Sequence, residues 1–225
     1  TEESGAANLE KEGKPANRIH FVGNVMIDTL LFNLEHAVPA ADTLASAGVP
    51  LTADSGYGLV TLHRPSNVDD PVVLERLLRV LGQISQRTPL LFPIHPRTAS
   101  RIADAGLQDL LDSFAITILQ PQGYLEMLGL MRDARVVLTD SGGIQEETTA
   151  LGVPCITLRE NTERPITVDQ GTNTIVGTDT NKILLAYEDV MASGGKVGRV
   201  PELWDGNTAQ RIVEVINAWA AAYAR

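Results

Sequence analysis

Two adjacent glycines stand where a chain can bind a phosphate. Gly142 and Gly143 follow an apolar run that ends near Thr139, and the polar run "IQEETTALG" comes directly after them. The pattern predicts a strand, a turn that includes Ser141, and then a helix. Unpaired N–H groups at a helix start point outward, the helix dipole favours negative charge there, and glycine leaves the backbone open to a phosphate. Ser141 can add a hydroxyl donor, so we interpret the turn as a diphosphate site.

The next helical turn carries a candidate sugar ligand. Glu147 lies one turn beyond Gly143 on the same helix face, where its carboxylate can accept hydrogen bonds from a ribose diol. Glu146 is rotated by about 100° from it, and we expect it to be solvated. A turn that uses glycine for its geometry, with Ser141 as a helix cap, explains the same residues. No lysine follows the glycines, which disfavours a P-loop, and the spacing is not the dinucleotide-binding GxGxxG.

Histidine and arginine follow two of the predicted strands. His63 and Arg64 come after "GLVTL", and His95 and Arg97 come after "LLFPI". Arginine suits phosphate binding through its planar fork, and histidine can donate to a phosphate or act as acid or base. The alternative for His63 is a histidine that caps strand carbonyls.

Two further loops extend the candidate site. Thr162 and Arg164 follow the strand after the glycine helix, and a right-handed βαβ unit places that loop beside the Ser-Gly-Gly turn. A guanidinium there would neutralise a diphosphate, whereas a solvated surface loop is the alternative. The stretch "QPQGYLEM" contains Gln122 and Met127 and can offer backbone groups to a base edge, although a plain turn into a helix fits as well.

These residues require a scaffold that brings strand ends together. From Tyr57 onward, short apolar runs alternate with amphipathic helical patterns, which predicts a doubly wound parallel α/β sheet of the Rossmann-like type. One helix is predicted to start with Asp70 as N-cap and Pro71 in its first turn. Gly152 is the predicted C-cap of the glycine helix. Ligands of such sheets bind outside the carboxyl ends of the strands, where the polar residues concentrate.

Composition limits the class of function. The 225 residues carry a net charge of −10, which disfavours a general nucleic-acid or membrane-surface role. No apolar stretch approaches a membrane span, and nothing at the start resembles a signal peptide, so we expect a cytoplasmic protein. Cys155 is the only cysteine and sits in an apolar run, which indicates a buried, inert thiol. We find no metal-ligand spacing.

The chain divides into three parts. Residues 1–37 are polar at first and then include a helix from about Val25 to Glu35. Residues 38–56 are rich in Pro, Gly, Ala and Ser, and we interpret them as mostly a linker, with room for a short helix. Residues 57–225 form the Rossmann-like domain.

Several motifs, taken in order, resemble one known family. They are "VTLHRPSNVDD", "PIHPRT", "QPQGYLEM", "LTDSGGIQEETTALGVPCITLRENTERP" and "DQGTN". Together they resemble the C-terminal domain of the non-hydrolysing UDP-N-acetylglucosamine 2-epimerases, and "TEESGAANLEKEG" with "RIHFVGNVMIDTLL" resembles the end of that family's first domain and the crossover. The resemblance implies half of a glycosyltransferase-B architecture. It also implies interconversion of UDP-N-acetylglucosamine and UDP-N-acetylmannosamine, by elimination and re-addition of UDP, without metal or redox cofactor.

The resemblance also implies roles for individual residues. His63 counts among the catalytically important positions, and the other proton-transfer acids are expected in a first domain that this chain lacks. The implied ligands of the nucleotide sugar are Arg64, His95, Gln122, Met127, Ser141, Gly142, Gly143, Glu147 and Arg164. Family members are commonly dimers, so a homodimer is expected for the full-length protein. The alternatives are a UDP-sugar glycosyltransferase and a non-catalytic module that binds UDP-sugars.

Overall fold

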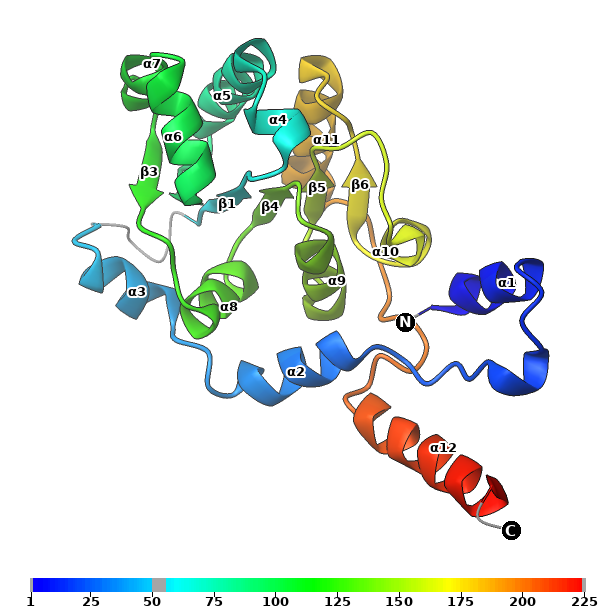
Figure 1. Ribbon diagram of the computed structural model, residues 1–225. Helices are drawn as coiled ribbons and strands as arrows, with labels where there is room; N and C mark the ends of the chain where they lie inside the picture. The colour runs from blue at the N-terminus through cyan, green and yellow to red at the C-terminus, as the bar shows by residue number, and fades with distance from the viewer. Residues whose placement is uncertain (1, 50–55, 224–225) are drawn as a thin grey trace.

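A single parallel sheet organises the molecule. The computed structural model describes residues 2–49 and 56–223, and its six strands lie in the order β3-β2-β1-β4-β5-β6 (Figure 1). The predicted doubly wound parallel sheet is therefore confirmed, with the order reversing between β1 and β4. The strands are β1 (Gly58–Thr61), β2 (Leu90–Pro93), β3 (Ile116–Leu119), β4 (Val136–Thr139), β5 (Cys155–Thr157) and β6 (Asn173–Ile175).

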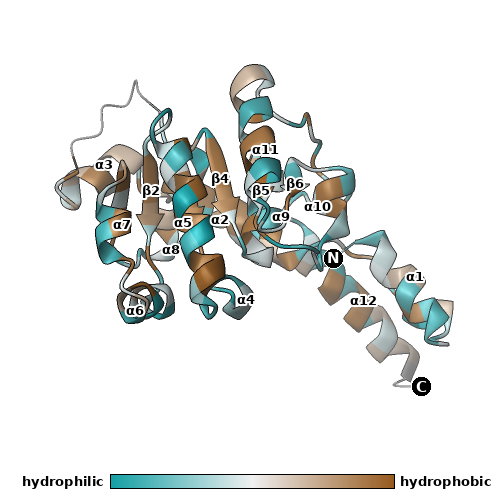
Figure 2. Cartoon of the chain, turned by 90° about the horizontal axis from the view of Figure 1, so that it is seen from above, coloured by the Kyte–Doolittle hydropathy of each residue, from teal (hydrophilic) through white to brown (hydrophobic). Residues whose placement is uncertain are grey.

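Helices cover both faces of the sheet, each over its own apolar core (Figure 1). On one face lie α4 (Pro65–Val68), α5 (Pro71–Ser85), α6 (Pro96–Asp104), α7 (Gln108–Asp112) and α11 (Thr180–Ser193). On the other lie α2 (Val25–Leu34), α3 (Ala40–Ser46), α8 (Tyr124–Arg132) and α9 (Gly142–Leu151). The remaining helices are α1 (Glu3–Lys11), the 3₁₀ turn η1 (Ala16–Arg18), α10 (Pro165–Asp169) and α12 (Thr208–Tyr223). The four inner strands β2, β1, β4 and β5 are buried between the layers, whereas the edge strands β3 and β6 are partly exposed. Strands β2 and β4 appear hydrophobic in Figure 2.

Local signals set the helix ends that position the site. The Asp70 side chain accepts from Val72 N at 2.9 Å and Pro71 begins α5, as predicted. Gly152 ends α9 with φ 72°, a left-handed conformation that glycine adopts without strain. Because β1, β4 and β5 end level, with Thr61 opposite Thr139 and Thr139 opposite Thr157, the residues after them lie on one edge.

The segment interpreted as mostly linker contains a packed helix. Ala40 and Leu44 of α3 are buried, and Val38 N–H donates to Leu125 O of α8 at 3.1 Å. A Cβ on Gly129 of α8 would collide with the Val38 carbonyl, so the two segments touch backbone to backbone. Residues 50–55 of the expected linker lie outside the described residues. The described part of residues 38–56 is thus attached to the sheet's helical layer.

The last helix is tied to the crossover helix α2. The Asp28 carboxylate accepts from Thr208 N at 3.1 Å and from Ala209 N at 2.7 Å, so a residue of α2 caps α12. In Figure 1, α12 extends away from the sheet. Among the described residues, we find no helix that is both long enough and apolar enough to cross a membrane.

Candidate functional site

A cavity of about 180 Å³ lies at the carboxyl ends of the strands. Four of the predicted site residues line it: His63, His95 and Gln122, which follow three different strands, and Met127 of α8. The expected convergence on one sheet edge is therefore found. The other lining residues are Thr61, Leu62, Pro93, Ile94 and Pro121.

A buried carboxylate orients His63. The His63 Nδ1 atom lies 3.0 Å from Asp140 Oδ1, and the Asp140 side chain is fully buried whereas the imidazole is 37% exposed. Since an ionised carboxylate only accepts, Nδ1 must carry the hydrogen. A neutral His63 then has a free lone pair on Nε2, the arrangement that a general base or a proton carrier needs.

His95 has the opposite hydrogen arrangement. Its Nδ1 accepts from Arg97 N at 3.1 Å and so caps α6, which assigns the hydrogen of a neutral ring to Nε2. The two rings face each other with centroids 5.8 Å apart. His95 thus caps a helix start, which was not expected from the sequence, and the same ring also lines the cavity as a donor. The pair offers an acceptor and a donor side by side.

Asp140 does more than orient one ring, and sequence reasoning missed it. Its Oδ2 atom accepts from His63 N at 3.0 Å, Arg64 N at 2.9 Å and Asn67 Nδ2 at 3.1 Å. Burial by itself would raise the pKa of Asp140, but the hydrogen bonds from the His63 ring and from the backbone of Arg64 and His63 outweigh it, so the pKa is lowered. The position of Asp140 between a buried strand and the glycine turn was the available signal. The carboxylate fastens the end of β1 to the end of β4.

The glycine turn is open. Ser141 is the N-cap of α9, but its side chain makes no capping bond, and its N–H donates to Thr139 Oγ1 at 3.0 Å. Among the described residues, no protein acceptor is recorded for the Gly142 or Gly143 amide. A Cβ on Gly142 would meet only Glu163 Oε2, at 3.7 Å. The space that an anion requires over these amides is therefore available.

Charged side chains of both signs lie next to this turn. Hydrogen bonds from Arg159 lower the pKa of Glu163 to about 2, so its carboxylate is ionised at neutral pH. Arg159 binds it through both Nη atoms, at 2.8 and 2.7 Å. Arg64 also lies near the turn, because its Nε donates to the carbonyl of Asp140, the residue before Ser141, at 3.3 Å. The turn is therefore flanked by one carboxylate and two guanidinium groups.

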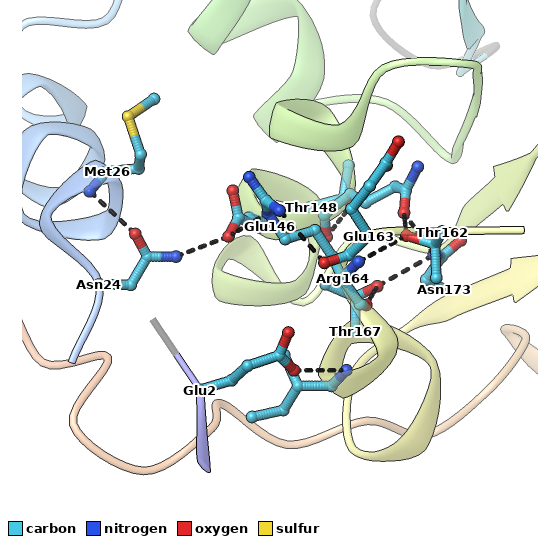
Figure 3. Close-up of polar contacts among 12 residues, drawn as sticks. Glu2, Asn24, Met26, Glu146, Thr148, Thr162, Glu163, Arg164, Thr167 and Asn173 are labelled. Atoms are coloured by element: carbon cyan, nitrogen blue, oxygen red, sulfur yellow. Dashed lines mark hydrogen bonds and ion pairs between the residues drawn. The ribbon is translucent and has the colours of Figure 1, made fainter. Parts of the chain in front are cut away.

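Glu146 is buried, contrary to the expectation that it is solvated. The residue is 2% exposed, and Asn24 Nδ2 of the α2 cap donates to its Oε1 at 2.8 Å (Figure 3). Arg164 Nε lies 2.9 Å from the same oxygen. The expectation was wrong because α2 covers this side of α9, a contact between segments far apart in the sequence. Glu147 is also buried, at 8% exposure.

The loop that carries Arg164 is attached to the glycine helix. Thr162 Oγ1 donates to Gln145 Oε1 at 2.5 Å and accepts from Arg164 N at 2.9 Å, which places the loop beside the turn as expected (Figure 3). The Arg164 Nε–H does not point along the line to Glu146, so their contact is an ion pair and not a hydrogen bond. Arg164 Nη1 also donates to Glu163 O at 3.1 Å. The Arg164 side chain is 36% exposed, and its guanidinium group has further N–H donors that a ligand could use.

The fold and the site define a Rossmann-like α/β domain with an open glycine turn at the point where the strand order reverses. The family described as UDP-N-acetylglucosamine 2-epimerase matches residues 1–217. The chain belongs to this family. The UDP-N-acetylglucosamine 2-epimerase of Methanococcus maripaludis is 38% identical over 216 residues, which are 95% of this chain and 58% of that protein.

Two solved structures are similar in fold. The Methanocaldococcus jannaschii UDP-GlcNAc 2-epimerase in complex with UDP-GlcNAc and UDP matches with a TM-score of 0.81 and 38% identity, over 94% of this chain and 58% of that one. The Neisseria meningitidis enzyme bound to UDP-GlcNAc matches with a TM-score of 0.82 and 28% identity, over 96% and 60%. This chain therefore spans about three-fifths of the length of these relatives.

Proposed function

We propose that this chain is the UDP-binding half of a UDP-N-acetylglucosamine 2-epimerase with two Rossmann-like domains. Residues 1–37 would end the first domain and cross over, 38–56 would connect, and 57–225 would bind UDP. The main support is the open Gly142–Gly143 turn beside the two-histidine cavity, in a member of this family.

The proposed ligand contacts follow the loops. Ser141, Gly142, Gly143 and Arg164 hold the diphosphate, and Arg64 adds positive charge beside them. Glu147 accepts from the ribose. Gln122 and Met127 lie against the uracil, and His95 donates from the cavity wall. These assignments combine the family resemblance with the arrangement of the same residues around one strand edge.

The proposed chemistry is removal of the proton at carbon 2 with loss of UDP from carbon 1, which leaves a glycal-type alkene. UDP then adds back at carbon 1 while a proton is delivered to the opposite face of carbon 2. As the bond at carbon 1 breaks, negative charge develops on the departing diphosphate. Amides fixed at a helix start and an arginine stabilise that charge without reorganising, which lowers the barrier. His63 offers Nε2 to the phosphate–sugar region. The acids that act at carbon 2 would come from the first domain, so this chain alone should turn over nothing.

Calorimetric titration with UDP at low salt tests the binding site. We expect the chain to bind UDP and Gly142→Ala to bind it at least about tenfold more weakly, because a methyl group occupies the phosphate position. The variant should fold normally, since the nearest atom outside the adjoining chain is Glu163 Oε2, at 3.7 Å from the new Cβ. Gly5→Ala, in a helix with open space around it, is the matched control. Equal UDP affinity of the two variants would refute the assigned phosphate position.

Product analysis with the full-length protein tests the reaction. Inversion at carbon 2 of UDP-N-acetylglucosamine without any acceptor supports epimerisation, whereas transfer that requires an acceptor supports a glycosyltransferase. Light scattering on the same protein tests the proposed homodimer. We also propose a cytoplasmic location, which the lone, buried Cys155 thiol fits.

A further inference from the structure

Tyr124, which is not among the predicted site residues, contacts Glu147, the residue proposed to bind the ribose. Tyr124 is the first residue of α8, and its hydroxyl donates to Glu147 Oε1 of α9 at 3.2 Å. Within residues 2–49 and 56–223, we find no second hydrogen bond to this carboxylate. One oxygen of Glu147 is therefore held by the protein, and the other remains for a ligand.

The hydrogen bond from Tyr124 favours ionisation of the buried Glu147 carboxylate. Burial raises the pKa of Glu147, the Tyr124 hydroxyl opposes that shift, and the charge of Glu146 adds to it. Burial and the nearby carboxylate raise the pKa of Tyr124 to about 12. The phenol is thus a hydrogen donor at any neutral pH, and it favours the ionised, acceptor-only form of Glu147.

The two side chains differ in exposure in a way that suits a ligand site. Tyr124 is 42% exposed, whereas Glu147 is 8% exposed. The Glu147 carboxylate is thus shielded from bulk water, whereas the neighbouring Tyr124 side chain is accessible to solvent. Both helices begin at the ligand edge of the sheet, α8 after Gly123 and α9 after Ser141. A nucleotide on the glycine turn would bring its sugar to this point.

We propose that Tyr124 is a positioning residue that makes the site selective for ribonucleotides over deoxyribonucleotides. By holding Oε1, it directs Oε2 of Glu147 to the ribose hydroxyls. A ligand without the 2′-hydroxyl would leave a buried acceptor unpaired, which is penalised strongly. This inference rests on the proposed function, because it takes Glu147 as the ribose ligand.

A purely structural role predicts different behaviour. If Tyr124 only satisfied a buried carboxylate, its loss would reduce stability and weaken every nucleotide by the same factor. A positioning role predicts a loss confined to ligands that carry the 2′-hydroxyl. The ratio of UDP affinity to 2′-deoxy-UDP affinity separates the two roles.

The experiment titrates the chain with UDP and with 2′-deoxy-UDP by calorimetry. We expect the unsubstituted chain to prefer UDP by about tenfold or more. In Tyr124→Phe, UDP affinity should fall about fivefold, and 2′-deoxy-UDP affinity less than about twofold, so the preference shrinks. Tyr187→Phe is the matched control: its hydroxyl pairs with Thr88 Oγ1 at 2.7 Å in the core on the other face of the sheet. This control should keep the full preference.

Each result decides a separate point. An unchanged preference in Tyr124→Phe would overturn the positioning role while leaving UDP binding intact. A chain that binds both nucleotides equally would overturn the ribose selectivity and, again, not the proposed function. A chain that binds neither nucleotide would refute the proposed function and this inference together.

Discussion

Replacing Asp140 by asparagine should loosen the junction between the two halves of the sheet. The substitution keeps the shape of the side chain and removes its charge. Three N–H donors, from His63, Arg64 and Asn67, point at the oxygen Oδ2, and the His63 ring points at Oδ1. An amide retains only one acceptor oxygen, so its NH₂ group must face either the three donors or the ring N–H. If it faces the ring, the His63 tautomer must change to avoid a clash.

The expected cost follows from the number of donors. A hydrogen bond to a charged group contributes about 1 kcal/mol more than one to a neutral group, so three of them give about 3 kcal/mol. The loss is partly offset, because the variant no longer has the desolvation penalty of a buried carboxylate. We expect Asp140→Asn to lower the free energy of unfolding by about 2 kcal/mol at pH 7.

The pH dependence gives an independent check. The folded-state pKa of Asp140 is lowered, because the hydrogen bonds from His63 and Arg64 outweigh burial. The stabilisation by the carboxylate is therefore present above the unfolded-state pKa of about 4 and is lost as the pH falls through the lower folded-state value. The difference between the unsubstituted chain and the variant should persist from pH 7 to 5 and shrink below about pH 4.

Urea unfolding followed by circular dichroism measures both quantities. Asp109→Asn, at an exposed position in α7, controls for the loss of one negative charge. Equal stability of the Asp140→Asn and Asp109→Asn variants at pH 7 would refute the reasoning, as would a destabilisation of Asp140→Asn that does not decrease between pH 5 and 3.

Two further outcomes are expected. Asn24→Ala should lower the free energy of unfolding by about 2 kcal/mol in urea titrations, because Asn24 Oδ1 caps α2 at Met26 N and its Nδ2 satisfies buried Glu146. A cost no greater than that of Asn33→Ala, at a partly exposed position of α2, would contradict this. Burial raises the pKa of Cys155 to about 11, so a thiol reagent at pH 8 should modify the chain only after guanidinium is added. Rapid labelling of the folded chain would show that the thiol is accessible.

The elements of the fold were predictable because their signals are local. The Leu74, Leu77, Leu78 and Leu81 stripe is completely buried, as the helical spacing of the leucines predicts. Asp70 with Pro71 and the left-handed Gly152 fixed helix ends that the structure reproduces. The short α4 was missed because one turn of helix leaves no periodicity to detect.

Site residues that directly follow a strand could be predicted from the sequence. Burial and contacts that depend on segments distant in sequence could not. The positions of His63 and His95 after their strands were sufficient to place both in one cavity. The burial of Glu146 depends on Asn24, which lies 122 residues away in sequence. The contact of Tyr124 with Glu147 likewise depends on how α8 packs beside α9, which no local pattern encodes.

The pairing of β1 with β4 has a consequence for how the protein acquires its site. The hydroxyls of Thr61 and Thr139 meet at 2.6 Å although they are 78 residues apart in sequence. Contacts of such long range form slowly, because the intervening chain must be ordered first. Neither half of the sheet alone contains both His63 and the glycine turn. Recovery of nucleotide affinity during refolding should therefore lag behind recovery of helical signal.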